Sequence, residues 1–422
     1  SCFLRPTNLL AESEAHLKQA EIKAGVFRVW CLAAKGHGQA FNVQTTLLQN
    51  LQYTEHLAEP MAELVTVYAK EFDGDSLGEK VLGEIADRQF NAQDSKSPRS
   101  FSKFLIRLAE TSPRLVLKQI VLLMKHLDSE SYPMRNSILE ILGLLIRELT
   151  LTEPGALDLD DTKHERLLTS FHDALFDRFL DLNSYVRAKA AAVLLKTCDL
   201  PPLLPKLRLK LAALAVRSLH DKAATVRKNC LALLNKLILT HPYGRMHGGE
   251  LAMSEWVRRR DQLVEELKVL DLPDRAEVEA RELMRDKEED EEGVGEGEGE
   301  EAEKQEDQPS DHGDDSDSDM DGTPKKRPPR ASTAPRKSAP RKSVHELASA
   351  SQSARLATVS PDALQKLRLT KQYYDDAIGF VELVEAALET VTELLASSVK
   401  SEVLEAMEVC KTAKEYRVEA AE

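Results

Sequence analysis

Apolar side chains recur at spacings of three and four residues along most of the chain, as in FSKFLIRLAE (101–110) and KLRLKLAALAVRSL (206–219). This period is typical of amphipathic α-helices, and the alternating pattern of half-buried strands is absent. Breaks marked by proline or glycine, such as Ser112-Pro113 and Gly248-Gly249, separate segments of about 12 to 20 residues. The pattern predicts an all-α protein.

One phrase occurs three times: an aspartate, then an apolar residue followed by an arginine, and then an apolar helix. The copies are LDSESYPMRNSILEILGLLI (127–146), LDLNSYVRAKAAAVLLKTCD (180–199) and LHDKAATVRKNCLALLNKLI (219–238). Counted from the residue before each arginine, offsets 0, 4, 7 and 8 are apolar in every copy. They are Met134, Ile138, Ile141 and Leu142; Val186, Ala190, Val193 and Leu194; and Val226, Cys230, Leu233 and Leu234.

Each phrase follows another amphipathic segment, so the repeating unit is a helical hairpin of about 40 residues. Such hairpins bury their apolar faces only by stacking on one another, which predicts a HEAT-type α-solenoid. The polar positions of the phrase have two interpretations, a ladder between neighbouring hairpins or a direct contact with a ligand such as DNA. The residues concerned are Asp128, Arg135, Asp181, Arg187, Asp221 and Arg227.

The formal net charge of −14 is concentrated in one segment. Residues 286–321 carry 19 acidic and 2 basic residues, and residues 325–342 carry 8 basic and no acidic residues. Such a composition cannot bury enough apolar surface to offset chain entropy, so we expect a long disordered charged insertion. The expected organisation is a solenoid over 1–285, an acidic-then-basic linker over 286–355, and a continuation of the solenoid over 356–422.

The cysteines and the apolar runs point to a soluble intracellular protein. The five cysteines form no CxxC motif or Cys/His ligand pair, so we expect buried thiols in a reducing compartment, with no metal and no cofactor. No apolar run approaches the roughly 18 residues of a membrane span, and no signal peptide is present. The first residue is Ser1 and the last lies in helical sequence, which suggests a piece of a longer chain.

Four segments together resemble the large HEAT-repeat subunit of condensin, in its fungal form. They are KHLDSESYPMRNSILEILG (125–143), DLNSYVRAKAAAVLL (181–195), ALAVRSLHDKAATVRKNCLALLNKLILTHPY (213–243) and KQYYDDAIGFVELVEAALETVTELLASSVKSEVLEAMEVCKTAKEY (371–416). The resemblance runs from about Gly25 to the end, outside the linker. Pro133 departs from the expected residue type before the Met134-Arg135 pair, although proline is tolerated at a helix start.

The resemblance implies a non-catalytic scaffold and regulatory subunit that acts in mitotic chromosome condensation. Its implied partners are a kleisin, the head of an SMC ATPase and double-stranded DNA bound without sequence preference. ATP hydrolysis would belong to the SMC subunits, and no nucleotide-binding loop occurs in this sequence. The implied location is the nucleus and chromosome, with a cytoplasmic phase in part of the cell cycle. A nuclear transport receptor, another HEAT solenoid, is the alternative; an enzyme is not expected.

Two groups of basic residues are candidates for contacts with DNA phosphates. Lys189 and Lys228 fall on the polar side of the second helix of their hairpins, although a solvated face would look the same. The run Arg258, Arg259, Arg260 follows Trp256, and a helix directs at most two of three consecutive arginines at one ligand.

Several serines and threonines match kinase patterns, so we expect mitotic kinases as partners. Thr323 and Ser97 precede proline, Ser338 and Ser343 follow Arg-Lys, and Ser316 and Ser318 stand among acidic residues. Each phosphate would add about 1.5 to 2 negative charges. Lys325, Lys326 and Arg327 read as a nuclear import signal.

Overall fold

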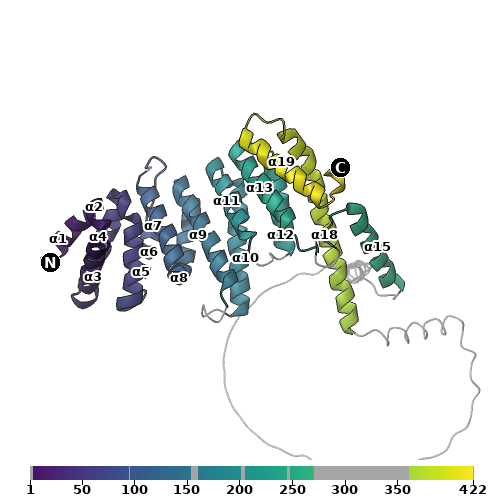
Figure 1. Ribbon diagram of the computed structural model, residues 1–422. Helices are drawn as coiled ribbons and strands as arrows, with labels where there is room; N and C mark the ends of the chain where they lie inside the picture. Colours follow the sequence, from purple (N-terminus) through teal and green to yellow (C-terminus); the bar gives the residue numbers. More distant parts are fainter. Residues whose placement is uncertain are drawn as a thin grey trace, which may run out of the picture. The chain divides into compact units, whose positions relative to one another are not determined.

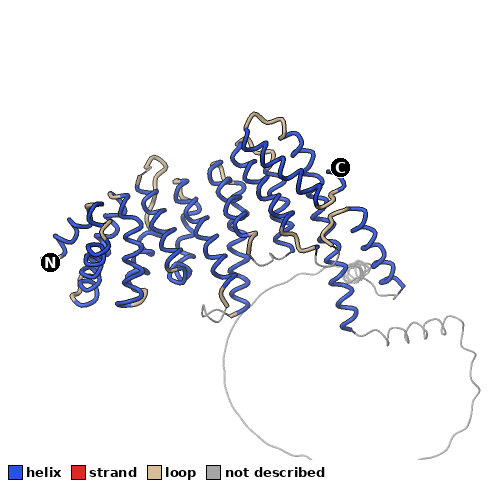
Figure 2. The backbone as a smooth tube through the Cα atoms, viewed as in Figure 1, coloured by secondary structure: helices blue, strands red, loops and turns tan. Residues whose placement is uncertain are grey.

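The computed structural model describes residues 3–94, 96–153, 160–200, 205–244, 248–269 and 361–421. Regular structure in these ranges is helical throughout, and they contain no strand (Figure 2). The α-helices are α1 (Leu4–Glu12), α2 (Glu14–Leu17), α3 (Ala20–Gly36), α4 (Ala40–Tyr53), α5 (Ala58–Tyr68), α6 (Ser76–Asp87), α7 (Ser97–Thr111), α8 (Pro113–Leu123), α9 (Tyr132–Leu151), α10 (Asp161–Asp177), α11 (Ser184–Thr197), α12 (Pro205–Ser218), α13 (Ala224–Leu239), α15 (Met253–Val269), α18 (Pro361–Leu394) and α19 (Lys400–Glu415). The prediction of an all-α fold is confirmed.

Short 3₁₀ or π turns adjoin several of these helices. They are η1 (Glu55–Leu57), η2 (Ala69–Asp73), η3 (Met124–Asp128), η5 (Arg178–Leu180) and η6 (Glu419–Ala421). The turns η3 and η5 lead directly into the loops that carry the first two copies of the repeated phrase.

Packing divides the chain into two compact units. The first comprises residues 1–260 and 370–422, and the second comprises residues 261–369, of which only 261–269 and 361–369 are described. The linker expected over 286–355 lies outside the described residues. The features analysed below lie in the first unit.

Within the first unit the helices pair into hairpins that stack in chain order (Figure 1). Helices α5, α7, α9, α11, α13 and α19 form one row, each packed against the next. Helices α6, α8, α10 and α12 form the other layer. Helix α6 packs against α8, and α8, α10 and α12 each contact a helix of the row. The predicted stack of helical hairpins is therefore confirmed.

The apolar offsets of the repeated phrase form the core between hairpins. Met134, Val186 and Val226, at offset 0, are all fully buried. Close packing also explains a glycine in the middle of α9, because a Cβ on Gly143 would lie 2.5 Å from Cγ1 of Val193 on α11. The pattern of offsets thus reports which face of each helix meets the next hairpin.

Helix starts follow the local sequence. Asn183 caps α11, since its side chain accepts a hydrogen bond of 2.8 Å from the Tyr185 backbone N–H. Helix α9 begins at Tyr132 with Pro133 in its first turn, where a missing N–H costs nothing. The proline that departs from the family pattern is thus accommodated at a helix start.

An aromatic cluster joins the segment before residue 260 to the segment after residue 370. The rings of Tyr243 and Trp256 contact the ring of Tyr373, with centroids 5.5 and 6.0 Å from it. The Tyr243 hydroxyl donates to the Asp376 carbonyl at 3.2 Å, and the Tyr373 hydroxyl donates to the Tyr243 carbonyl at 2.9 Å. We call these three rings the closing cluster.

Candidate nucleic-acid and partner interface

The arginine of each repeated phrase binds an acidic side chain of the next hairpin. Arg187 on α11 donates from Nε and Nη2 to both carboxylate oxygens of Asp221, at 2.6 and 2.9 Å. Arg135 on α9 donates one hydrogen bond to Asp181, from Nη2 to Oδ1 at 3.2 Å, and its Nε lies 3.0 Å from Oδ2 as an ion pair. A bidentate pair such as Arg187–Asp221 fixes orientation as well as charge, so it holds the angle between its two hairpins.

These arginines also donate hydrogen bonds to backbone carbonyls of the loop that precedes their own helix. Nη1 of Arg187 donates to the carbonyls of Asp181 and Leu182, at 2.8 and 3.2 Å. Arg227 repeats this contact with the carbonyls of Asp221 and Lys222, at 2.7 and 3.2 Å. One guanidinium therefore ties the turn within a hairpin to the next hairpin.

The last rung of this ladder uses a residue that the repeated phrase does not contain. Arg227 binds both oxygens of Glu402 on α19, with 3.0 Å between Nη2 and Oε2. The Glu402 side chain is fully buried at a position where the other hairpins carry an apolar residue. Burial by itself would raise its pKa, but hydrogen bonds from Arg227 and Ser397 outweigh burial and lower it.

Asp128 does not take the ladder position that the alignment gave it. Its carboxylate is 82% exposed and lies 3.3 Å from Nη1 of Arg178, on the surface. Ser129, six residues before Arg135 as Asp181 is before Arg187, accepts the arginine through its carbonyl at 2.5 Å. Asp128 lies seven residues before its arginine, whereas Asp181 and Asp221 lie six residues before theirs. The first copy of the phrase is therefore one residue longer, which moves Asp128 out of the ladder position.

The two candidate DNA lysines differ in their surroundings. Lys189 forms an ion pair with Glu140 of α9, and Lys196 binds the same carboxylate at 2.7 Å. Burial would raise the pKa of Glu140, but these two lysines outweigh it and lower the pKa. Lys228 is partly exposed and has no ion pair with any described residue. Of these two lysines, Lys228 is therefore the one whose charge is not compensated by a described acidic side chain.

The arginine run on α15 is partly neutralised by its own helix. Arg258 and Arg259 both bind the Glu255 carboxylate, at 2.6 and 2.8 Å, and lower its pKa to about 2. The guanidinium carbon of Arg259 also lies 5.3 Å from the centre of the Trp256 ring. Two of the three arginines thus converge on one carboxylate, and Arg260 follows them on the same helix.

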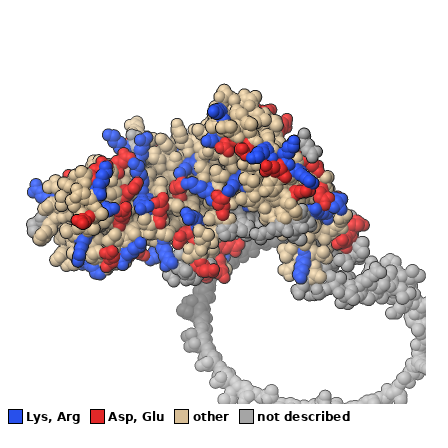
Figure 3. Space-filling model, viewed as in Figure 1, with Lys and Arg blue, Asp and Glu red and all other residues tan. Residues whose placement is uncertain are grey.

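The surface of the described residues carries both signs of charge. On the face drawn in Figure 3, lysines and arginines alternate with aspartates and glutamates over the stacked hairpins. A mixed surface of this kind attracts polyanions weakly from a distance, because opposite charges cancel within a Debye length of about 8 to 10 Å. Any DNA contact here therefore depends on local groups such as Lys228.

The phosphorylation candidates fall into two groups. Ser97 is the first residue of α7 and only 8% exposed, and its backbone N–H donates to Asp94 at 3.2 Å. A kinase would need this helix start to open. The other candidates, Thr323, Ser316, Ser318, Ser338 and Ser343, and the import residues Lys325, Lys326 and Arg327 lie outside the described residues.

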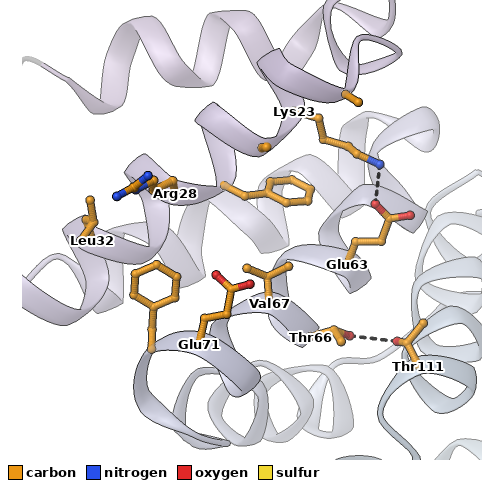
Figure 4. A pocket seen from close by; sticks show the side chains of 12 residues that line it. Lys23, Arg28, Leu32, Glu63, Thr66, Val67, Glu71 and Thr111 are labelled. Carbon is orange, nitrogen blue, oxygen red and sulfur yellow. Dashed lines mark hydrogen bonds and ion pairs between the residues drawn. The ribbon is translucent and has the colours of Figure 1, made fainter.

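A groove between α3 and α5 was not anticipated from the sequence. It has a volume of about 750 Å³ and is bordered by side chains of α3, α5, η2 and Thr111 of α7 (Figure 4). Lys23 and Glu63 form an ion pair of 2.7 Å across it. No sequence signal marks it, since it depends on the spacing of two helices that are 40 residues apart.

Side chains that could bind a metal are not grouped in the part of the chain that the structure covers. No cluster of three or more His, Cys, Asp or Glu side chains that could hold a metal occurs in these ranges. Among the same residues, Cys31, Cys198 and Cys230 are buried free thiols with raised pKa values, while Cys410 is partly exposed. No described helix is both long and apolar enough to cross a membrane.

A family model and the curated relatives of this chain agree with one another. The family described as non-SMC mitotic condensation complex subunit 1, N-term, matches residues 1–43. The sequence is 31% identical to condensin complex subunit 1 of Schizosaccharomyces pombe over 97% of the chain. It is 32% identical to the Saccharomyces cerevisiae protein of that name over 100% of the chain. Over nearly its whole length the chain is similar to the condensin subunit 1 family.

The condensin resemblance predicted from the repeated phrases is thus confirmed. The chain spans about a third of the length of these two yeast relatives, 32% and 33%. The human condensin complex subunit 1 is 26% identical over 54% of the chain, which is 16% of that relative.

Similarity to solved structures adds little to the condensin relationship. A structure titled Kap95:Nup1 complex aligns with 98% of the chain and 47% of its own, at 9% identity and a TM-score of 0.37. An engineered protein aligns with 97% of the chain at 12% identity and a TM-score of 0.33. Similarity at this level supports no conclusion about function.

Proposed function

We propose that this chain is part of a non-catalytic scaffold subunit of condensin, which binds the kleisin, an SMC ATPase head and double-stranded DNA during mitotic chromosome condensation. The observation that carries the proposal is the similarity of nearly the whole chain to about a third of yeast condensin complex subunit 1. Nucleus and chromosome are the corresponding locations. Catalysis of ATP hydrolysis would belong to the SMC subunits.

The ladder geometry supports a scaffold role. Arg135, Arg187 and Arg227 each join one hairpin to the next through an ion pair, which is bidentate for Arg187 and Arg227. Binding surfaces assembled from several repeats need their relative angles fixed, because a small rotation per repeat accumulates along the stack. A stack pinned in this way presents a preformed surface to partners, at a lower entropic cost of binding.

For DNA, the contact would be electrostatic and independent of sequence. Lys228 is the strongest candidate, because Lys189 is compensated by Glu140 and Arg258 by Glu255. Unpaired cations displace counterions from the phosphate backbone, which supplies affinity without reading bases.

The test is co-purification. The full-length protein that contains this chain, tagged and isolated from mitotic cells, should bring down a kleisin and an SMC pair in equal amounts. Purified alone, it should neither bind nor hydrolyse ATP in calorimetry and phosphate-release assays. Recovery of a small GTPase in place of the SMC pair, or stoichiometric ATP binding, would overturn the proposal.

A further inference from the structure

Helix α3 packs less closely against the row of helices than the members of the row pack against one another. From α5 to α13 each helix of the row rests on the next, whereas α3 packs mainly on α1 and α4. The groove of about 750 Å³ lies between α3 and α5, and no described side chain fills it. A groove of this size can hold several side chains of a bound segment of another molecule.

The floor and walls of the groove are largely apolar. One face of α3 contributes residues at helical spacing, and α5 with η2 contributes the opposite wall. The apolar lining residues are Ala20, Ala24, Phe27, Leu32, Val67 and Phe72. Leu32 is 46% exposed, although a leucine loses about 1.5 to 3 kcal/mol of hydrophobic stabilisation when it is left fully in water. The two alanines leave room for another backbone to approach α3.

The charged groups of the groove differ in whether they are paired. Lys23 and Glu63 neutralise each other at 2.7 Å. Arg28 on α3 and Glu71 on η2 are exposed, and neither forms an ion pair with a described side chain. Figure 4 shows these two side chains extending from opposite walls without contact. The groove therefore offers one free cation and one free anion beside its apolar floor.

We propose that this groove docks one amphipathic helix of a partner protein. The lining from Ala20 to Leu32 spans 13 residues, and the rise between the first and the last is about 18 Å, which corresponds to a partner helix of roughly three turns. Its apolar residues, at spacings of three and four, would contact Phe27, Leu32 and Val67. Charge complementarity requires a carboxylate that reaches Arg28 and a cation that reaches Glu71.

Other occupants fit the groove less well. The two cations of the groove, Lys23 and Arg28, are matched by Glu63 and Glu71, so the groove offers the phosphates of nucleic acid no net attraction. The proposal goes beyond the scaffold function, because it holds whichever assembly the full-length protein joins.

The first experiment identifies the occupant. The full-length protein carries the photo-crosslinker p-benzoylphenylalanine in place of Leu32, is irradiated in its native host, and the cross-linked peptides are sequenced by mass spectrometry. The expected product is a single segment of another protein with apolar residues three and four apart, at least one acid and at least one base. A cross-link to a second copy, to nucleic acid, to a segment without this pattern, or to nothing overturns the proposal.

The second experiment tests the chemistry with a synthetic fluorescein-labelled peptide of the captured segment. Ala24→Trp fills the groove and should weaken binding at least about tenfold, the equivalent of 1.4 kcal/mol. Ala396→Trp, the same change on an exposed turn far along the chain, should leave affinity unchanged. Equal binding by Ala24→Trp and the unmodified protein would contradict docking in this groove.

Charge reversal provides a readout that a folding defect cannot mimic. Arg28→Glu, at an exposed position, should weaken binding about fivefold, and a peptide with its acid changed to lysine should restore it. Circular dichroism should match between the variants. Failure of the reversed peptide to restore binding would show that Arg28 does not contact the partner, and would overturn the proposed charge pairing.

Discussion

The Arg227 guanidinium on α13 binds the buried Glu402 carboxylate on α19, 175 residues further along the chain. This pair continues, across the sequence insertion, the same contact that Arg187 makes with Asp221 of the adjacent hairpin. The C-terminal hairpin is therefore joined to the stack by the same rule that joins its other members.

Removing the arginine of this pair should destabilise the protein strongly. Arg227→Ala leaves a buried carboxylate without its cation, so we expect a loss of about 3 kcal/mol in the free energy of unfolding. Asp128→Ala, which breaks the pair with Arg178 from its exposed side, is the control and should cost under about 1 kcal/mol. Urea denaturation followed by circular dichroism measures both, and equal losses would contradict the ladder.

The corrected register makes a separate prediction for the two aspartates. Asp221→Asn removes the charge that holds Arg187 and should cost about 1 to 3 kcal/mol, because hydrogen bonds to charged groups are worth that much. Asp128→Asn should change stability by less than about 0.5 kcal/mol at its exposed site. Thermal melts in the same buffer compare them. A larger loss of stability for Asp128→Asn than for Asp221→Asn would show that Asp128, as the sequence alignment predicted, belongs to the ladder.

Stability should decline in mild acid. Burial lowers the pKa of His126 and His172, and burial with nearby Arg208 lowers the pKa of His241 from 6.5 to about 4. A depressed histidine pKa means that the unfolded state binds protons more readily, so stability is complete above pH 6.5 and falls as pH drops toward 4.

His241→Gln should flatten this dependence, because glutamine does not titrate. The measurement is the urea midpoint at intervals between pH 7.5 and pH 5. His56→Gln, at an exposed position, serves as the control and should leave the slope unchanged. An identical slope for His241→Gln and the unmodified chain would show that His241 does not carry the effect.

Two glycines of α6 should respond in opposite directions to alanine. A Cβ on Gly78 would clash with Cδ2 of Leu115 on α8, so Gly78→Ala should cost about 1 to 3 kcal/mol by overpacking. Gly83 has open space around its Cα, so Gly83→Ala should gain up to about 1 kcal/mol from helix propensity. Differential scanning calorimetry resolves the two shifts. A stabilised Gly78→Ala variant would mean that α6 and α8 can move apart.

DNA binding by the assembled complex should depend on Lys228. Lys228→Glu should weaken affinity for every duplex sequence and flatten the slope of log affinity against log salt by roughly 0.9. Lys222→Glu, on the exposed turn of the same hairpin, is the matched control. Fluorescence anisotropy at four salt concentrations gives both slopes. Equal slopes would exclude a phosphate contact at Lys228.

The sequence predicted the parts of this molecule that depend on local periodicity. Offsets 0, 4, 7 and 8 identify the buried face because helical geometry alone places Val226 and Cys230 on one side. Arg187 and Asp221 were recognised as special by repetition, although repetition did not say which aspartate each arginine binds. That choice depends on stacking order, which is a tertiary property.

Other features could not be predicted because they depend on distant segments. Glu402 stands at an apolar offset in a hairpin that lacks the repeated phrase, and only the approach of Arg227 makes a buried carboxylate tolerable there. The pairing of Lys189 with Glu140 joins two hairpins and changes a candidate DNA contact into a compensated charge. The groove beside Arg28 exists only because α3 and α5 are set apart.

The closing cluster of Tyr243, Trp256 and Tyr373 holds together the two stretches of chain that flank the sequence insertion. Covalent continuity through the insertion is therefore not what keeps α13 beside α19. We therefore expect that lengthening, shortening or recharging that interval leaves the register of the hairpins unchanged. For the experimenter, the same feature makes the interval a natural place to graft a tag or to split the polypeptide into two fragments that reassemble.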